Sequence, residues 1–240
     1  DDLCYKNPVN KNIKLQSAVA PTEKKAYTQA EYDIVWEFAR SHPYGLAIMV
    51  MMETGISRSE LLGLRWDNLD LDNKIIYIEQ GLVQQKSTET DKLVLASDGL
   101  KNKFRRRPIP ISSDLANALK AKPVTIYVGG NKQKGIEPKP IRTEYVFHAP
   151  NGGPSRPDNW YKREYANFMS DLQTAHPEIK LLTPHELRHT RATLSANDNV
   201  DLLQLAKLLG HSDLSMLIKR YAHTDVEAVR KALKIDEDDG

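Results

Sequence analysis

The stretch TPHELRHT at residues 183–190 determines how the last third of this chain is expected to fold. Thr183 is suited to the N-cap of a helix, and Glu186 stands where its side chain can complete a capping box. Residues three or four positions apart share one face of a helix, so His185 and Arg188 are expected to point the same way. The positive end of the helix disfavours protonation of His185, and a neutral imidazole beside a fixed cation is a plausible base next to an anion.

A second stretch, LGH at residues 209–211, ends ten positions before Tyr221. Asp201 suits the N-cap of a helix that Gly210 would end as a C-cap, and His211 would follow just outside it. Tyr221 falls on the apolar face of the next expected helix, where a tyrosine is more often part of the core than a reactive group. The basic residues that precede it nevertheless favour a reactive role, in which the phenol attacks a phosphate.

The first half of the chain carries the same kind of helix signal. Thr28 with Glu31, and Ser57 with Glu60, each place a cap residue three positions before a glutamate. Residues 44–52 are apolar enough to form a more buried helix between these two starts. The first third of the chain is therefore predicted to be rich in α-helix.

The middle of the chain has the character of β-strands. Residues 74–79, 92–96 and 107–111 are short segments with clustered aliphatic residues or alternating prolines. We expect them to form a small antiparallel sheet with the last segment at an edge. Residues 80–90 and 129–142 are expected to be irregular surface insertions, because both are longer than a tight turn requires. The predicted fold class is α+β and mainly α-helical.

The composition is that of one sizeable domain with a short additional segment. The chain has 240 residues, of which 40% are apolar, and its single cysteine, Cys4, cannot form an internal disulfide. Its longest strongly apolar stretch, residues 46–52, is far too short to cross a bilayer, so we expect a cytoplasmic protein without a membrane partner. The net charge of +2 is small but unevenly placed, with a basic segment at residues 101–107 and an acidic one at 236–239.

Together these residues resemble the tyrosine recombinases, a family that includes phage and conjugative-transposon integrases. Members have an arginine near a Thr-Gly turn, a lysine in a β-hairpin, a His-x-x-Arg pair, a Leu-Gly-His segment and then a tyrosine. The corresponding catalytic positions in this sequence are Arg58 after Thr54-Gly55, Lys101, His185, Arg188, His211 and Tyr221. The similarity extends from about residue 25 to residue 229, and the combination of motifs is specific although no single motif is.

The resemblance implies the tyrosine recombinase catalytic-domain fold and a phosphoryl transfer that needs neither a metal nor another cofactor. Tyr221 would attack a DNA phosphodiester, form a 3′-phosphotyrosyl link and release a 5′-hydroxyl. Arg58 and Arg188 would hold the non-bridging oxygens, on which an in-line displacement builds negative charge. We therefore expect a site-specific DNA recombinase, encoded by a bacterium, a phage or a mobile element, that supports integration or excision.

The other matched positions would move protons or bind DNA. Lys101 would protonate the leaving 5′-oxygen, His185 would accept the tyrosine proton, and His211 would donate a hydrogen bond to the phosphate. A solvated basic hairpin without a chemical role is the alternative for Lys101. The remaining cations of that hairpin are expected to bind DNA phosphates without sequence preference, namely Lys103, Arg105, Arg106 and Arg107.

The two ends of the chain have separate expected roles. Residues 1–25 are polar and lack an apolar period, like the linker that follows an N-terminal core-binding domain in these integrases, and such a domain is expected to be missing here. The catalytic domain would span residues 26–235, and residues 236–240 would form an acidic tail. The implied partners are double-stranded DNA attachment sites and other copies of the chain, joined as a tetramer on DNA through a C-terminal helix. Folding of that helix back onto its own chain is the alternative.

One position departs from the family pattern. The family usually places arginine two residues after the glycine, where this chain has Ser57, and Arg58 stands one position later. Either a shifted helix start lets Arg58 reach the same phosphate oxygen, which we favour, or the position is lost. In the second case the chain is a catalytically weakened, DNA-binding relative of the recombinases.

A zinc hydrolase is a third hypothesis. The segment HELRH at residues 185–189 has two histidines one helical turn apart and a glutamate after the first, which is a zinc-binding pattern. However, Ala192 and Ser195 stand where the extended pattern requires glycine and histidine. The sequence therefore disfavours this hypothesis.

Overall fold

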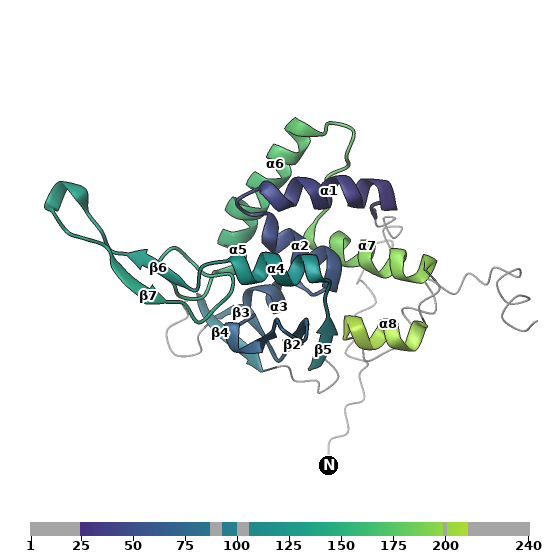
Figure 1. Ribbon diagram of the computed structural model, residues 1–240, viewed down its shortest axis with the longest axis horizontal. Helices are drawn as coiled ribbons and strands as arrows, with labels where there is room; N and C mark the ends of the chain where they lie inside the picture. Colours follow the sequence, from purple (N-terminus) through teal and green to yellow (C-terminus); the bar gives the residue numbers. More distant parts are fainter. Residues whose placement is uncertain (1–24, 87–92, 100–105, 199–200, 211–240) are drawn as a thin grey trace, which may run out of the picture.

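The computed structural model describes residues 25–86, 93–99, 106–198 and 201–210 (Figure 1). Its first two helices are α1 (Gln29–Ser41) and α2 (Gly45–Thr54). The predicted capping box starts α1, because the carboxylate of Glu31 accepts a hydrogen bond from the backbone N–H of Thr28 at 2.7 Å. Most residues of α2 are buried, as expected for a helix that is apolar on all sides. Both predicted helices are therefore confirmed.

The strands form three separate antiparallel groups. The first has the order β1-β2-β5, made of β1 (Leu69–Asp70), β2 (Ile75–Ile78) and β5 (Arg107–Pro110). β5 lies at an edge of this sheet, which suits a strand with two prolines. The other two groups are the pairs β3 (Gln80–Lys86) with β4 (Leu93–Gly99), and β6 (Thr125–Val128) with β7 (Lys139–Arg142).

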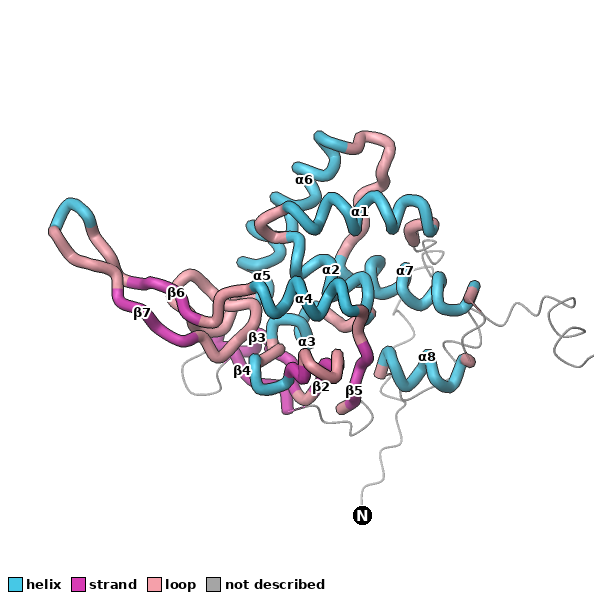
Figure 2. The backbone as a smooth tube through the Cα atoms, in the orientation of Figure 1, coloured by secondary structure: helices cyan, strands magenta, loops and turns pink. Residues whose placement is uncertain are grey.

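Six further helices follow along the described chain. They are α3 (Arg58–Leu62), α4 (Ser113–Ala121), α5 (Pro157–Trp160), α6 (Ala166–Ala175), α7 (Pro184–Asn197) and α8 (Leu202–Leu209), with a π-helical turn at Tyr161–Tyr165 between α5 and α6. Figures 1 and 2 show α7 and α8 together on one side of the molecule, opposite the projecting hairpin of β6 and β7. In the described part of the chain, no helix is both long and apolar enough to cross a membrane.

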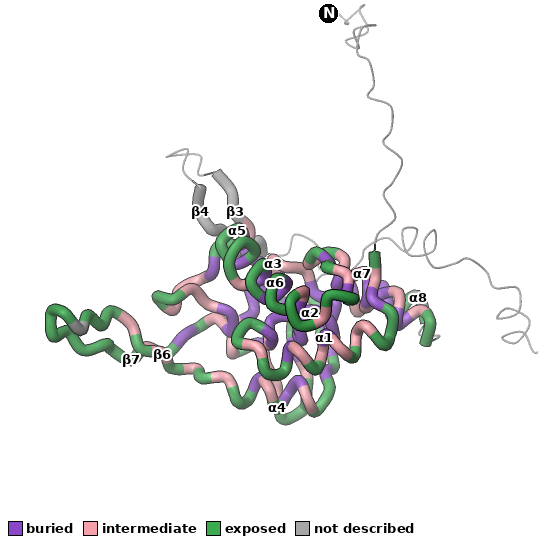
Figure 3. The backbone as a smooth tube through the Cα atoms, turned by 90° about the horizontal axis from the view of Figure 1, so that it is seen from above, coloured by how far each residue is buried: buried purple, intermediate pink, exposed green. Residues whose placement is uncertain are grey.

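The main core lies between α1, α2, α4, α6 and the β1-β2-β5 sheet. Val35, Met51, Ile76, Leu119 and Phe168 supply one side chain from each of five elements, and each is fully buried. Burying a side chain of this size contributes about 1.5–3 kcal/mol. A smaller apolar cluster joins α7 to α8, and Figure 3 shows buried segments concentrated in the body of the molecule, with the hairpin of β6 and β7 exposed. The two clusters fix α7 and α8 relative to the rest.

Three expectations from the sequence are wrong. Residues 92–96 are expected in one sheet with 74–79 and 107–111, but the strand at residues 93–99 instead pairs with residues 80–86 in a separate two-stranded sheet. Residues 80–86 form a regular strand that pairs with β4, and residues 139–142 form the second strand of a hairpin, so neither expected insertion is wholly irregular. Both pairs are two-stranded, and the two missed strands, QGLVQQK at residues 80–86 and KPIR at residues 139–142, contain few apolar residues. A strand without a well-buried face needs no alternation of apolar and polar residues, and that alternation is the signal from which a strand is predicted.

A substitution at Gly45 tests the close packing of α1 against α2. A Cβ atom at this position would lie 1.8 Å from the carbonyl oxygen of Ala39, so the backbone would have to move. We expect Gly45→Ala to lower the free energy of unfolding by about 1–3 kcal/mol, as overpacking does, measured by urea denaturation. Gly153→Ala is the matched control, because its nearest neighbour would be the side chain of Asn151 at 3.4 Å. Equal losses in both variants would contradict this packing.

Candidate functional site

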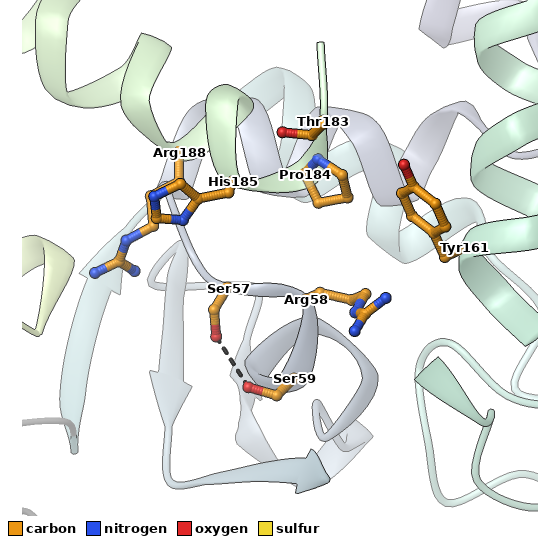
Figure 4. Close-up of a pocket in the computed structure, with 8 residues that line it drawn as sticks. All are labelled: Ser57, Arg58, Ser59, Tyr161, Thr183, Pro184, His185 and Arg188. Atoms are coloured by element: carbon orange, nitrogen blue, oxygen red, sulfur yellow. Dashed lines mark hydrogen bonds between the residues drawn. The ribbon is translucent and has the colours of Figure 1, made fainter. Parts of the chain in front are cut away.

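A surface pocket lies between the start of α3, the π-helical turn and the start of α7. Its lining residues are Ser57, Arg58, Ser59, Tyr161, Thr183, Pro184, His185 and Arg188. Figure 4 shows His185 and Arg188 at one end of the pocket and Tyr161 at the other, with Ser57 and Arg58 between them. The structure therefore brings together three of the predicted catalytic residues, which come from two segments far apart in the sequence.

The predicted capping box builds the start of α7. The hydroxyl of Thr183 accepts a hydrogen bond from the backbone N–H of Glu186 at 3.3 Å, and the carboxylate of Glu186 accepts one from the N–H of Thr183 at 2.8 Å. These two bonds hold the first turn of the helix. His185 lies exposed in that turn, and Arg188 follows three residues later, so both side chains reach the same pocket.

The same capping box bears on the zinc hypothesis. A zinc hydrolase would need the carboxylate of Glu186 as a base beside the metal, but this carboxylate is hydrogen-bonded to both the N–H and the hydroxyl of Thr183. Within the described ranges, no three His, Cys, Asp or Glu side chains are grouped so that they could hold a metal ion. The capping role of Glu186 thus does not suit the zinc-hydrolase pattern.

Arg188 is held in place by contacts with three other elements. One terminal nitrogen, Nη1, donates to the carbonyl oxygen of Gly55 after α2 at 2.9 Å, and Nη2 donates to the carbonyl oxygen of Leu209 at the end of α8. The carboxylate of Glu60 in α3 lies 3.8 Å from Nη1. The side chain is only 14% exposed. Arg188 is therefore a permanent positive charge with little conformational freedom at the edge of the pocket.

Glu60 is the buried negative charge behind this pocket. Its carboxylate accepts hydrogen bonds from Nη1 and Nη2 of Arg107 at 2.9 and 3.3 Å and from the backbone N–H of Ser57 at 2.8 Å. The side chains of Glu60 and Arg107 are only 4% and 5% exposed. Burial by itself raises the pKa of Glu60, but Arg107, the N–H of Ser57 and the charge of Arg188 together hold that pKa below its ordinary value. Glu60 is therefore ionised at neutral pH.

Ser57 and Arg58 have different roles at the start of α3. Ser57 is the N-cap, and its hydroxyl accepts a hydrogen bond from the backbone N–H of Glu60 at 3.3 Å. Arg58 is the first residue of the helix, and its guanidinium carbon lies 5.8 Å from the ring centre of Tyr161. Figure 4 shows Arg58 pointing toward Tyr161 and away from Arg188. A cation–π contact at an exposed site contributes only about 0.5–1 kcal/mol, so Arg58 can leave this position at low cost.

Of the other predicted site residues, the structure describes only Arg106 and Arg107. Lys101, Lys103, Arg105, His211 and Tyr221 lie outside the described residues. Arg106 is exposed, as a cation that contacts DNA would be. The side chain of Arg107, however, is buried against Glu60, so the expectation of a solvated cation at this position is wrong. The physical reason is the alternation of β5, which turns Arg107 and Ile109 inward together.

Two residues of the site were not predicted from the sequence. Glu60 was identified only as part of a capping box, and its buried ion pair leaves no additional local signal. Tyr161 belongs to the π-helical turn, where its ring stacks on that of Tyr165 at a centroid distance of 5.5 Å. Neither role could be inferred without knowing which distant side chains would face these residues.

Comparison with known sequences matches residues 25–228 of this chain to the Phage integrase family. The Integrase of Staphylococcus phage L54a is 30% identical over 177 residues, which cover 74% of this chain and 47% of that protein. The Transposase from transposon Tn916 of Enterococcus faecalis is 25% identical in an alignment 244 residues long, which covers 98% of this chain and 56% of that protein. The chain spans about half the length of the curated relatives it matches.

Solved structures of integrases have the same fold. The Tn1549 transposon integrase in complex with circular intermediate DNA superposes with a TM-score of 0.68 at 23% identity, over 88% of this chain and 66% of that one. The catalytic domain of bacteriophage HP1 integrase superposes with a TM-score of 0.52 at 21% identity, over 89% of this chain and 96% of that one. The predicted fold, a tyrosine recombinase catalytic domain of the α+β class, is therefore confirmed.

The lowered pKa of Glu60 predicts how stability depends on pH. A carboxyl group whose pKa is lower in the folded than in the unfolded state stabilises the fold fully above the unfolded value, which is about 4.3. That contribution is lost as the pH falls through the folded pKa. We therefore expect the free energy of unfolding, measured by urea denaturation at a series of pH values, to decrease on acidification below about pH 4 in part through Glu60.

Glu60→Gln is the variant that isolates this effect. It should lower the free energy of unfolding at neutral pH by about 3–5 kcal/mol, because Arg107 is left buried without its counter-charge, and it should reduce the dependence on acid. Glu37→Gln is the matched control, because Glu37 is 75% exposed and forms a surface ion pair with Arg40, so a change of about 0–1 kcal/mol is expected. An unchanged acid dependence in Glu60→Gln would refute the assignment.

Proposed function

Because the chain belongs to the phage integrase family, we propose that it is the catalytic part of a site-specific DNA recombinase that acts through a phosphotyrosyl intermediate. The catalytic domain would span residues 26–235. The observation that carries this proposal is that Arg58, His185 and Arg188 line the same pocket. Two permanent cations and an imidazole at a surface pocket suit the stabilisation of a phosphate under attack.

The proposed reaction is a transfer of one phosphoryl group from DNA to the protein and back. The phenolic oxygen of Tyr221 forms a bond to phosphorus while the bond from phosphorus to the 5′-oxygen breaks. His185 takes the proton of the phenol, and Lys101 supplies a proton to the leaving 5′-oxygen, which becomes a hydroxyl. Attack by a 5′-hydroxyl on the phosphotyrosyl link reverses these steps and rejoins the DNA.

Arg188 is suited to hold the scissile phosphate because its position is set before DNA binds. Its bonds to the carbonyl oxygens of Gly55 and Leu209 restrict the guanidinium, so little reorganisation is needed when charge develops in the transition state. Arg58 would leave the ring of Tyr161 and bind a second phosphate oxygen. His211 would donate a further hydrogen bond to the same phosphate.

Double-stranded DNA attachment sites are the proposed substrate, and further copies of this chain are the proposed partners. The Tn1549 transposon integrase, a structural relative with a TM-score of 0.68, was solved in complex with circular intermediate DNA, which supports a DNA substrate. Lys103, Arg105 and Arg106 would bind backbone phosphates, and the C-terminal helix would join protomers into a tetramer on DNA. The phage and transposon relatives support integration or excision of a mobile element, in the cytoplasm of a bacterial host.

A nicked DNA duplex tests the proposed chemistry, because the short cleaved strand diffuses away and the covalent intermediate accumulates. The full-length protein should form a covalent adduct with the cognate site, detected on a denaturing gel, and Tyr221→Phe should abolish it by removing the attacking oxygen. Tyr127→Phe is the matched control, since Tyr127 is 70% exposed on the β6–β7 hairpin. An adduct that survives Tyr221→Phe would refute the assigned nucleophile. No adduct from the unaltered protein would favour the catalytically weakened relative.

Substitution of Arg58 tests whether this arginine, one position later than in the family pattern, takes part in catalysis. Arg58→Ala should lower the single-turnover rate of adduct formation by about 10²–10³-fold, the usual effect of removing one group that stabilises the transition state. Arg40→Ala is the control, because Arg40 lies on α1 in an ion pair with Asp114 and does not line the pocket. A normal rate for Arg58→Ala would show that Arg58 has no catalytic role.

Ser57→Arg places the family residue at its usual position. If Arg58 already binds the phosphate, Ser57→Arg should leave the rate within about tenfold of the unaltered chain, which corresponds to 1.4 kcal/mol of activation free energy. Loss of the serine cap should lower the free energy of unfolding by about 1 kcal/mol, and this is measured separately. A much larger rise in rate, together with a normal rate for Arg58→Ala, would identify the weakened relative.

A further inference from the structure

Arg107 connects elements that lie far apart in the sequence. Its two terminal nitrogens donate to the carboxylate of Glu60 in α3, and its Nε donates to the carbonyl oxygen of Leu208 in α8 at 2.6 Å. The strand that carries it, β5, follows the segment that contains Lys101. With 5% of its side chain exposed, Arg107 is a buried, forked link between α3, β5 and α8.

The end of α8 has a shape that accommodates this guanidinium. Gly210 ends the helix in the left-handed conformation, with φ at 68°, and a Cβ atom there would lie 2.7 Å from Nη1 of Arg107. The next carbonyl along, that of Leu209, accepts from Arg188. The last carbonyl groups of a helix lack partners within it and form the negative end of its dipole. Two arginines that share Glu60 therefore hold two consecutive carbonyl groups at the end of α8.

We propose that Arg107 is a positioning residue for DNA cleavage. It holds the C-terminal end of α8 against Glu60, and it thereby sets the place of Arg188, which also bonds to the end of α8. This inference rests on the proposed recombinase function. Arg107 acts through Arg188 and α8, and it does not bind DNA itself. A lysine could not replace it, because one ammonium group lacks the planar fork that bonds a carboxylate and a separate carbonyl oxygen at once.

Arg107→Lys tests this role while keeping the positive charge. The single-turnover rate of adduct formation at saturating DNA should fall by about 10- to 100-fold, because a small displacement of groups around the phosphate is enough to slow the chemical step. The dissociation constant for DNA and its dependence on salt should remain as in the unaltered protein. Thermal unfolding establishes that the variant is folded at the assay temperature.

Arg106→Ala supplies the contrast, because Arg106 is the exposed neighbour in the sequence. It should weaken DNA binding and reduce the slope of log affinity against log salt by about 1, as the loss of one phosphate contact does. If Arg107→Lys and Arg107→Ala weaken DNA binding in the same way as Arg106→Ala, Arg107 is a phosphate contact and the inference is wrong. A normal cleavage rate in folded Arg107→Lys would also refute it.

Gly210→Ala keeps the test decisive if Arg107→Lys is too unstable to assay. The added methyl group would push against the guanidinium of Arg107, so this variant should also cleave more slowly at saturating DNA. Hydrogen exchange gives a measurement that does not require activity. In both variants the amides of the last turn of α8 should exchange faster, while those of α1 should not change. No adduct from the unaltered protein would refute the recombinase function, whereas unchanged exchange in α8 would refute the positioning role.

Discussion

The charge of Glu60, almost completely removed from water, links α3, β5 and α7 behind the pocket. A buried carboxylate loses hydration worth several kcal/mol, and only well-placed charged and polar partners offset that loss. The partners here are the N–H of Ser57 at the start of α3, Arg107 on β5 and Arg188 on α7. A shift of any one of them would leave part of this charge unpaired, so a single buried group links the position of the sheet to that of the pocket.

The ends of two helices supply hydrogen-bond acceptors for Arg188. The carbonyl oxygens of Gly55 and Leu209, after α2 and at the end of α8, have no partner within their helices and accept from its guanidinium. The capping boxes of α3 and α7 direct the first turns of both helices toward the same space. Carbonyl groups at the end of any helix need a hydrogen-bond partner from outside that helix. Here two of them orient Arg188, the cation that we propose holds the phosphate.

Local signals in the sequence predicted the helix starts at Thr28, Ser57, Thr183 and Asp201, and the structure confirms each of them. A capping interaction joins residues only two or three positions apart, so a short segment contains all of it. The strands were predicted less completely. The sequences of β3 and β7 contain few apolar residues and show no alternating apolar face, so they were missed, whereas β2, β4 and β5 contain clustered aliphatic residues or alternating prolines and were found.

The sequence by itself determined where four helices begin and where α8 ends, and it placed His185 and Arg188 on one face of the same turn. Only the tertiary structure decided which cations are exposed and which are buried. Arg106 and Arg107 are neighbours of the same type, yet one is exposed and the other forms a buried pair with Glu60, which lies 47 positions earlier. The reason is that β5 alternates between the two faces of its sheet, and which face is buried depends on pairing with β2 and packing against α3 and α8. Neither neighbour carries that information in its local sequence.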